Sequence, residues 1–376
     1  AEERGVGASL PLLAIAAGAL AVLVLAVGVY LYRSFSADVD YGRLVIATGP
    51  VTGTYHALGI SLARVLASKE SFSTVEVLST DGSVQNMGLI SEPGSDVDLA
   101  FVQGDASPST NARLITALYD EVLHIVLSPS ASERIRSIYD LQGQRVTLGA
   151  AGSGTRELSG RVLRHFGVEV GEDLLLSPAE MVAALAQDQV DAAFLLSPIP
   201  SRLITDLAQQ DGVRFLSLGE SGREGGEAHA LELNFPGMRR KIIPRSTYVR
   251  LPRRPVHTVG VTAMLVARED VDEELVRDIT SILFGHRAGE LGLEGSELTV
   301  ARQIREDYDP ATVTIPYHPG SHAYYLREQP PFFVEYAEAL SLGLTLLLAL
   351  YSVFIAVREW LRRRMKNRVD AYLLQA

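Results

Sequence analysis

The 376-residue sequence contains no cysteine. Disulfides, thiolate zinc sites and cysteine nucleophiles are therefore excluded, and cysteine use gives no information about the redox compartment. Lysine is scarce, since it occurs only at Lys69, Lys241 and Lys366, and the remaining positive charges are arginines; the 34 basic residues are outnumbered by 45 acidic ones. The net charge of −11 argues against a nucleic-acid partner, because a phosphate backbone requires a basic surface.

The motifs of common enzyme sites are also missing. There is no Gly-x-Ser-x-Gly elbow, and the glycine turn at 152–155 lacks a Walker lysine. His318 and His322 are four residues apart, but Pro319 and Gly320 oppose the helix that would bring both imidazoles to one metal. We therefore expect no catalytic residues, no metal and no cofactor, and predict that the protein is not an enzyme.

Two long runs carry no charged residue, at 10–32 and 339–357. A helix needs about 20 apolar residues to cross a hydrocarbon core of roughly 30 Å, so both runs are long enough. The first exceeds the usual apolar region of a cleaved signal peptide, which favours an uncleaved anchor. The alternative for either run is a buried core helix.

The basic residues that follow the second run set the predicted orientation. Clustered arginine and lysine stay on the cytoplasmic side of a membrane. We therefore predict that residues 1–9 and the tail 358–376 are cytoplasmic, and that the region between the spans lies outside. In a bacterial inner membrane, that region would be periplasmic. The cluster comprises Arg358, Arg362, Arg363, Arg364, Lys366 and Arg368.

Between the two runs, β-rich segments alternate with helical patterns, which indicates an α/β fold with mostly parallel strands. The predicted strands are 44–48, 73–79, 99–102, 123–127, 145–150, 174–176, 192–196 and 259–267. The predicted helices are 54–68, 83–91, 154–166, 178–187 and 273–284.

Three strand-to-helix turns, at 49–55, 81–83 and 152–155, are rich in glycine, serine and threonine. The N-terminus of a helix carries roughly half a positive charge and has free N–H groups, so it suits a carboxylate or a phosphate. In open α/β sheets such turns lie at the carboxyl ends of strands, where ligands collect. The alternative is that the hydroxyl side chains are ordinary N-caps and the glycines ordinary turn residues.

A series of segments follows in order along the chain: "IATGPVTGTYHALGISLARVLA" (46–67), "STDGSVQNMGLI" and "SDVDLAFVQGD" (79–105), "IYDLQGQRVTLGAAGSGTR" (138–156), "VDAAFLLSPIP" (190–200), "HTVGVTAMLVAREDVDEELVRDIT" (257–280) and "HPGSHAYYLRE" (318–328). Together they resemble the TAXI family of substrate-binding proteins, the receptors of one branch of TRAP transporters. The likeness covers about residues 42–328, and the two predicted spans make a membrane-anchored branch of the family the closer match.

The resemblance implies a two-lobed periplasmic-binding-protein fold of type II, with two crossover segments and flanking transmembrane helices. Lobe one would comprise residues 42–124 plus 260–325, and lobe two residues 125–259. The crossovers would lie near 124–127 and 257–262. Ligand would bind in the cleft between the lobes, which would close by a hinge motion.

The residues that the resemblance places at the cleft come from both lobes. Tyr55 forms a wall of the cleft or belongs to the core, and Gln103 bonds to ligand or to backbone. Arg156 is a bidentate carboxylate partner, or else it points to solvent or to Glu157. The ligand-binding residues are Thr52, Gly53, Thr54, Tyr55, Ser83, Gln103, Ser153, Gly154, Thr155, Arg156, Ser197, Pro198 and Tyr248.

The function that follows is a membrane-anchored extracytoplasmic receptor for a small anionic solute, a glutamate-like amino acid or an organic acid. Its partners would be TRAP-type membrane transporter subunits and the lipid bilayer. The alternative is a ligand-sensing or structural accessory subunit of a larger membrane protein complex. The second span and the basic tail motivate that alternative.

Overall fold

The computed structural model describes residues 41–68, 72–107, 109–219, 226–285, 295–304, 306, 308, 314–327 and 337–373. The first predicted span, at 10–32, and the predicted cytoplasmic segment 1–9 lie outside the described residues. The described residues up to His322 form one compact unit, and those from Ala323 form a second.

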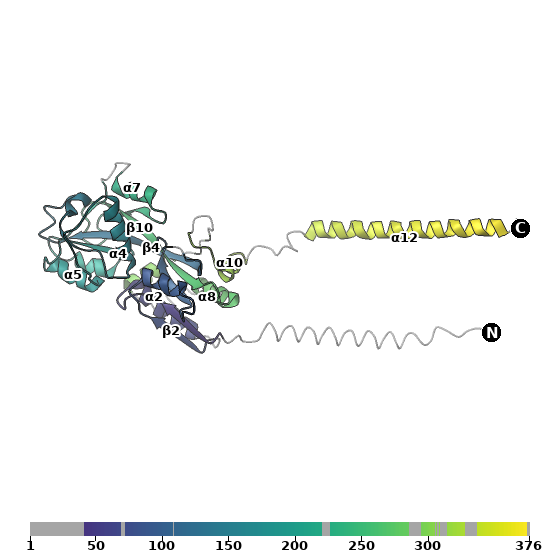
Figure 1. Cartoon of the computed structure of the whole chain (residues 1–376), viewed down its shortest axis with the longest axis horizontal. Coiled ribbons are helices and arrows are strands. Elements are labelled where there is room, and N and C mark those ends of the chain that lie inside the picture. Colours follow the sequence, from purple (N-terminus) through teal and green to yellow (C-terminus); the bar gives the residue numbers. More distant parts are fainter. Residues whose placement is uncertain are drawn as a thin grey trace. The chain divides into compact units, whose positions relative to one another are not determined.

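The first unit is built on one curled sheet (Figure 1). Its strands follow the order β2-β1-β3-β10-β4-β7-β5-β6, with β8 added beside β4 and β9 beside β10. The strands are β1 (Arg43–Ala47), β2 (Thr74–Leu78), β3 (Leu99–Gln103), β4 (Ala112–Leu127), β5 (Arg145–Thr147), β6 (Glu172–Asp173), β7 (Ala192–Ser197), β8 (Arg214–Phe215), β9 (Arg239–Ile243) and β10 (Val256–Arg268).

The expectation of a mostly parallel sheet is wrong, because the sheet is mixed. Strand β1 is parallel to β2 and β3, and β5 is parallel to β6 and β7. Strands β4 and β10 run antiparallel to each other, and each is also antiparallel to further neighbours. These two long strands connect the two parallel groups. The predicted strand at 123–127 is only the end of β4, which has 16 residues.

Helices cover the sheet at the positions that the periodicity predicts. All five predicted helices are confirmed within two residues: α2 (Thr54–Ala67), α3 (Ser83–Ser91), α4 (Gly154–His165), α5 (Pro178–Ala186) and α8 (Glu273–Gly285). The sequence patterns did not reveal the shorter helices η1 (Ile138–Leu141), α6 (Arg202–Leu207), α7 (Glu227–Asn234), α9 (Gly295–Ala301) and α10 (Pro319–Tyr325). The expectation that Pro319 and Gly320 oppose a helix is wrong, because α10 begins at Pro319, where a proline is tolerated in the first turn. The predicted strand at 174–176 is absent, and the two-residue β6 precedes it.

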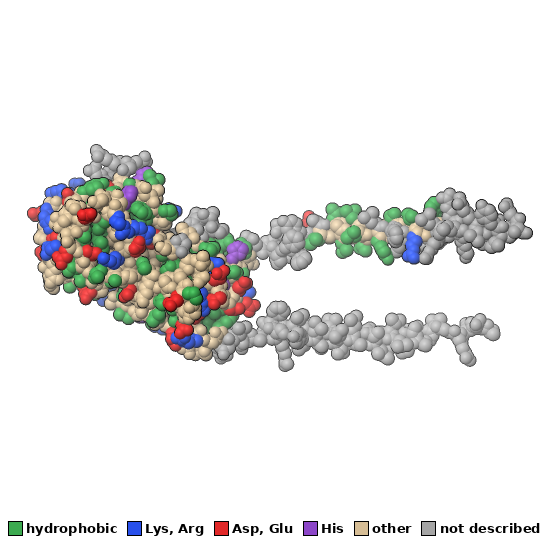
Figure 2. All heavy atoms as spheres, viewed as in Figure 1, with side chains coloured by type: hydrophobic (Ala, Val, Ile, Leu, Met, Phe, Trp, Pro, Cys, Tyr) green, Lys and Arg blue, Asp and Glu red, His purple; other side chains and the backbone are tan. Residues whose placement is uncertain are grey.

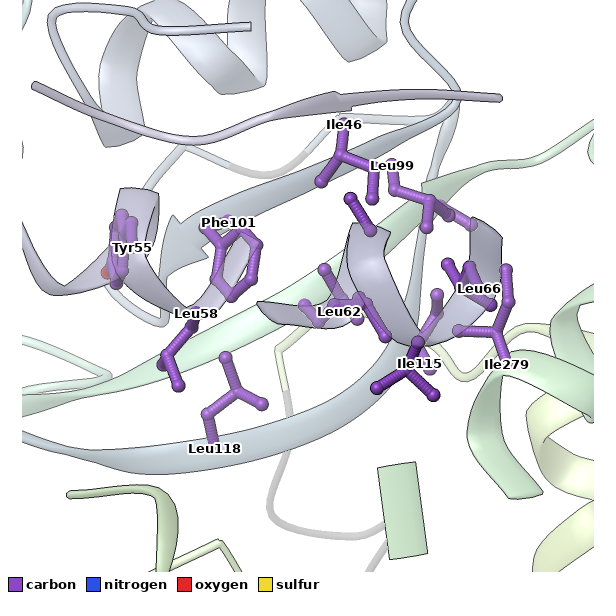
Figure 3. Packing of buried hydrophobic residues seen from close by; sticks show 14 of the residues in the cluster. Ile46, Tyr55, Leu58, Leu62, Leu66, Leu99, Phe101, Ile115, Leu118 and Ile279 are labelled. Carbon is purple, nitrogen blue, oxygen red and sulfur yellow. The ribbon is translucent and has the colours of Figure 1, made fainter. Parts of the chain in front are cut away.

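Apolar side chains pack on both sides of the sheet. In one cluster, Leu62 and Leu66 of α2 lie against Ile115 of β4 and Ile279 of α8, and all four are buried (Figure 3). Another cluster joins β5, α4 and β7 through Val146, Leu158 and Phe194, among others. Because burial of apolar area is the main favourable term in folding, these clusters hold α2 and α4 against the strands whose ends they follow.

The second unit contains one long helix, α12 (Ala337–Leu373). Its stretch Leu340–Arg358 has a mean hydropathy of 2.3, and none of it is buried. Exposed hydrophobic side chains lie along this stretch (Figure 2), and they include Leu342, Leu344 and Leu347. Within the described part of the chain, α12 is the one helix with the length and composition to cross a membrane, and it contains the predicted span at 339–357.

Candidate ligand-binding site

The three glycine-rich turns meet around one cavity of about 170 Å³ in the first unit. The turns follow β1, β2 and β5, and further lining residues lie at the ends of β3 and β7. Carboxyl ends of parallel strands therefore surround the cavity, as expected for a ligand site in an α/β sheet. The predicted residues that line it are Thr52, Gly53, Thr54, Tyr55, Ser83, Gln103, Ser153, Gly154, Thr155, Ser197 and Pro198.

The helices that start at the cavity differ in how they are capped. The N-cap residues of α2 and α3 are Gly53 and Gly82, and neither helix has a side-chain cap. Gly82 has φ +121°, a left-handed conformation that suits glycine. In α4, the hydroxyl of Ser153 accepts a hydrogen bond from the N–H of Arg156 at 3.2 Å. The N-cap alternative thus holds for Ser153, whereas α2 and α3 present first-turn N–H groups that no side chain caps.

Gln103, the last residue of β3, connects the start of α3 with the start of α4. Its backbone N–H donates to the hydroxyl of Ser83 at 2.8 Å. Its amide oxygen lies so close to Gly154 that a Cβ built there would be 1.7 Å away. Only a glycine at 154 leaves room for the Gln103 side chain in this position.

Glu121 of β4 is a buried carboxylate in the cavity wall that the sequence analysis missed. Its Oε2 accepts hydrogen bonds from the Tyr55 hydroxyl at 2.9 Å and from Nε2 of Gln103 at 2.8 Å. Burial raises the pKa of Glu121 to about 7, although both hydrogen bonds favour the charged form. No sequence motif points to Glu121, and the one local signal is an acidic residue within an otherwise mostly buried strand.

Tyr55 satisfies both alternatives, since it is part of the core and also lines the cavity. Its ring stacks on Phe101 with 5.4 Å between ring centroids (Figure 3). Its hydroxyl bonds to Glu121. The ring therefore fixes the position of a donor beside the buried carboxylate.

Two predicted ligand residues lie away from the cavity. The Arg156 guanidinium pairs with Asp173 at 2.7 Å, rather than with Glu157, and donates to the carbonyl of Gly149. Tyr248 is 2 % exposed, and its hydroxyl lies 2.7 Å from Nε2 of His124. Both side chains already have partners in the fold, so we leave them out of the proposed site.

The fold and this cavity define an α/β protein with a small cavity, lined by polar and apolar residues, at the carboxyl ends of its strands. The family model described as "NMT1-like family" matches residues 46–329. The chain belongs to the NMT1-like family.

Several solved structures are similar to the chain at low identity. The periplasmic aliphatic sulphonate binding protein SsuA from Escherichia coli is 16 % identical, with 77 % of this chain and 84 % of that chain covered and a TM-score of 0.39. An ancestral arginine-binding protein bound to arginine is 15 % identical, with 70 % and 98 % covered and a TM-score of 0.41.

The regulatory domain of MetR, a LysR family regulator from N. meningitidis, is 11 % identical, with 64 % and 91 % covered and a TM-score of 0.41. Binding proteins and a regulator thus both occur among these similar structures. The likeness does not select a function, because one fold can serve many.

Proposed function

We propose that the chain is a membrane-anchored extracytoplasmic receptor that captures a small anionic solute for a TRAP-type transporter. The solute is an amino acid or an organic acid with a carboxylate. The carrying observation is that the first turns of α2, α3 and α4 line one cavity, together with threonine and serine hydroxyls. Three helix N-termini supply partial positive charge and N–H donors without a buried cation.

The two-lobed periplasmic-binding fold is part of this proposal. Strands β4 and β10 would be the crossovers, and residues 42–124 plus 260–325 and 125–259 the two lobes. Gln103 and Gly154 would then touch across the closed cleft, and a solute bound in the cavity beside them would stabilise the closed form.

The anchor in this proposal is α12, with the Arg-rich tail in the cytoplasm and the binding region in the periplasm of a bacterial inner membrane. Tethering would raise the effective concentration of the receptor at its transporter. The alternative role, an accessory subunit of another membrane complex, is distinguished by co-purification. Recovery with transporter subunits supports the proposal, whereas recovery only with an unrelated complex rejects it.

The binding experiment is isothermal titration calorimetry of the full chain in detergent with a panel of amino acids and organic acids. At least one carboxylate should bind, and the double variant Gln103→Ala/Thr155→Ala should weaken it by about tenfold or more, because it removes two polar groups of the cavity. The matched control is Thr74→Ala/Gln187→Ala, at two exposed positions away from the cavity. A panel without a single binder contradicts the proposal.

A further inference from the structure

The cavity has an uneven distribution of charge. Among the described residues that line it, the charged ones are Asp81, Glu121, Arg202 and Glu297. Of these only Glu121 is buried, while the one cation, Arg202, is exposed. A solute that enters therefore meets a buried carboxylate as well as three helix N-termini.

Among the described residues, Glu121 accepts hydrogen bonds from neutral donors only, and at only one of its two carboxylate oxygens. Both of its hydrogen bonds, from Tyr55 and from Gln103, are made to Oε2. In the described part of the chain it forms no ion pair, and the carboxylate of Asp105 raises its pKa further by charge repulsion. A buried carboxylate without a cation is costly, so a cationic partner from outside would be bound favourably.

The two donors also place Glu121 next to the helix starts. Tyr55 is the second residue of α2, and Gln103 contacts both Ser83, the first residue of α3, and Gly154, the first residue of α4. The helix N-termini, which favour a negative group, and Glu121, which favours a positive one, are thus separated by single side chains in a cavity of about 170 Å³. An α-amino acid carries its carboxylate and its ammonium on one carbon, which matches this closeness.

Building on the proposed receptor function, we infer that Glu121 is the specificity-determining residue of the site and that it accepts a hydrogen bond from the ammonium group of an amino-acid solute. The solute carboxylate lies at the helix N-termini. A plain organic acid brings no cation to Glu121 and is bound less well, because its carboxylate and that of Glu121 repel each other.

The test compares matched compounds that differ by one ammonium group. The full chain in detergent at about pH 8 is titrated by calorimetry with L-glutamate and glutarate, L-alanine and propanoate, and L-leucine and 4-methylpentanoate. The amino acid of at least one pair should bind about tenfold or more tightly than its partner. This measurement uses the wild-type chain, so it does not depend on the folding of a variant.

Glu121→Gln then keeps the shape of the side chain and removes its charge. It should weaken the preferred amino acid by about tenfold or more and strengthen binding of the matching organic acid. Asp120→Asn is the control, because Asp120 is the adjacent carboxylate of β4, is not part of the cavity lining and pairs with Lys241. It should leave both affinities unchanged.

The outcomes separate this inference from the function on which it rests. If organic acids bind as tightly as their amino-acid partners, or if Glu121→Gln weakens both alike, the role of Glu121 is rejected while the receptor function stands. If no compound of either kind binds, the receptor function is rejected and the inference with it.

Discussion

The Arg161 guanidinium of α4 donates to both the carboxylate and the main-chain carbonyl of Asp105, at 2.7 and 3.1 Å. The Asp105 side chain is 2 % exposed, and that of Arg161 is 20 % exposed. Close by, the backbone N–H of Gln85 in α3 lies 3.4 Å from the carbonyl of Gly152. These contacts join the segment after β3 and the start of α3 to the turn and helix on the other side of the cavity.

Asp105→Asn should destabilise the protein by about 1–3 kcal/mol, because it removes the buried counter-charge of a mostly buried guanidinium and leaves the half-exposed Glu157 as its ion-pair partner. Urea unfolding followed by circular dichroism measures this change. The comparison variant is Arg43→Gln, which removes an exposed ion pair with Glu76 and should cost less than about 1 kcal/mol. Equal losses of stability in the two variants would show that the Asp105–Arg161 pair stabilises the fold no more than an exposed ion pair does.

Gly154→Ala should weaken solute binding by about tenfold or more, since its Cβ would occupy the position of the Gln103 amide and break the bond to Glu121. Calorimetry measures the affinity. In a Gln103→Ala background the same substitution should have little further effect. Gly88→Ala, in α3 with nothing within 4 Å of the added Cβ, should leave binding unchanged. An additive loss in the double variant argues against this contact.

Patterns along the sequence predicted the helices well because α2, α4 and α8 each bury one face, so their apolar residues recur at helical spacing. They predicted the extent of β4 poorly. Its residues face different neighbours along its length, β10 first and then β7 and β8, so burial is nearly continuous and no single alternation extends through it.

The glycine-, serine- and threonine-rich turns predicted most residues of the candidate site, but not its buried carboxylate. The residues 52–55, 83 and 153–155 all line the cavity, since each follows the carboxyl end of a strand. Glu121 could not be found in the same way, because its role depends on contacts with Tyr55 and Gln103 that are 66 and 18 residues away in sequence. Long-range contacts of this kind leave no local pattern.

His124 should make stability depend on pH in the acidic range. Burial lowers its pKa to about 4, whereas in the unfolded chain the pKa is about 6.5. Between these values the unfolded chain binds more protons than the folded one, so stability falls as the pH falls from 6.5 through 4.

His124→Gln cannot become charged. Between pH 7 and pH 4 its free energy of unfolding relative to wild type should therefore shift in favour of the variant by on the order of 3 kcal/mol. Chemical unfolding of both proteins at both pH values measures the difference in free energy of unfolding. If this difference is the same at pH 7 and at pH 4, His124 is not held neutral in the fold.

Glu121 should make stability depend on pH in the direction opposite to that of His124, and at higher pH. Its pKa is raised to about 7 by burial, from about 4.5, so between these values the folded chain binds more protons than the unfolded one. The contribution of Glu121 to stability therefore falls as the pH rises from 4.5 through 7. Glu121→Gln removes this dependence.

The stability of Glu121→Gln relative to wild type should consequently rise between pH 5 and pH 8, by up to about 3 kcal/mol. Unfolding of both proteins at each pH gives the difference, from which the other titrating groups cancel. Asp120→Asn provides the control at the neighbouring position, with a side chain that is 47 % exposed, and should show no comparable rise. A constant difference for Glu121→Gln would mean that this carboxyl ionises in the cavity as readily as in water, and a solute ammonium would then gain little by binding to it.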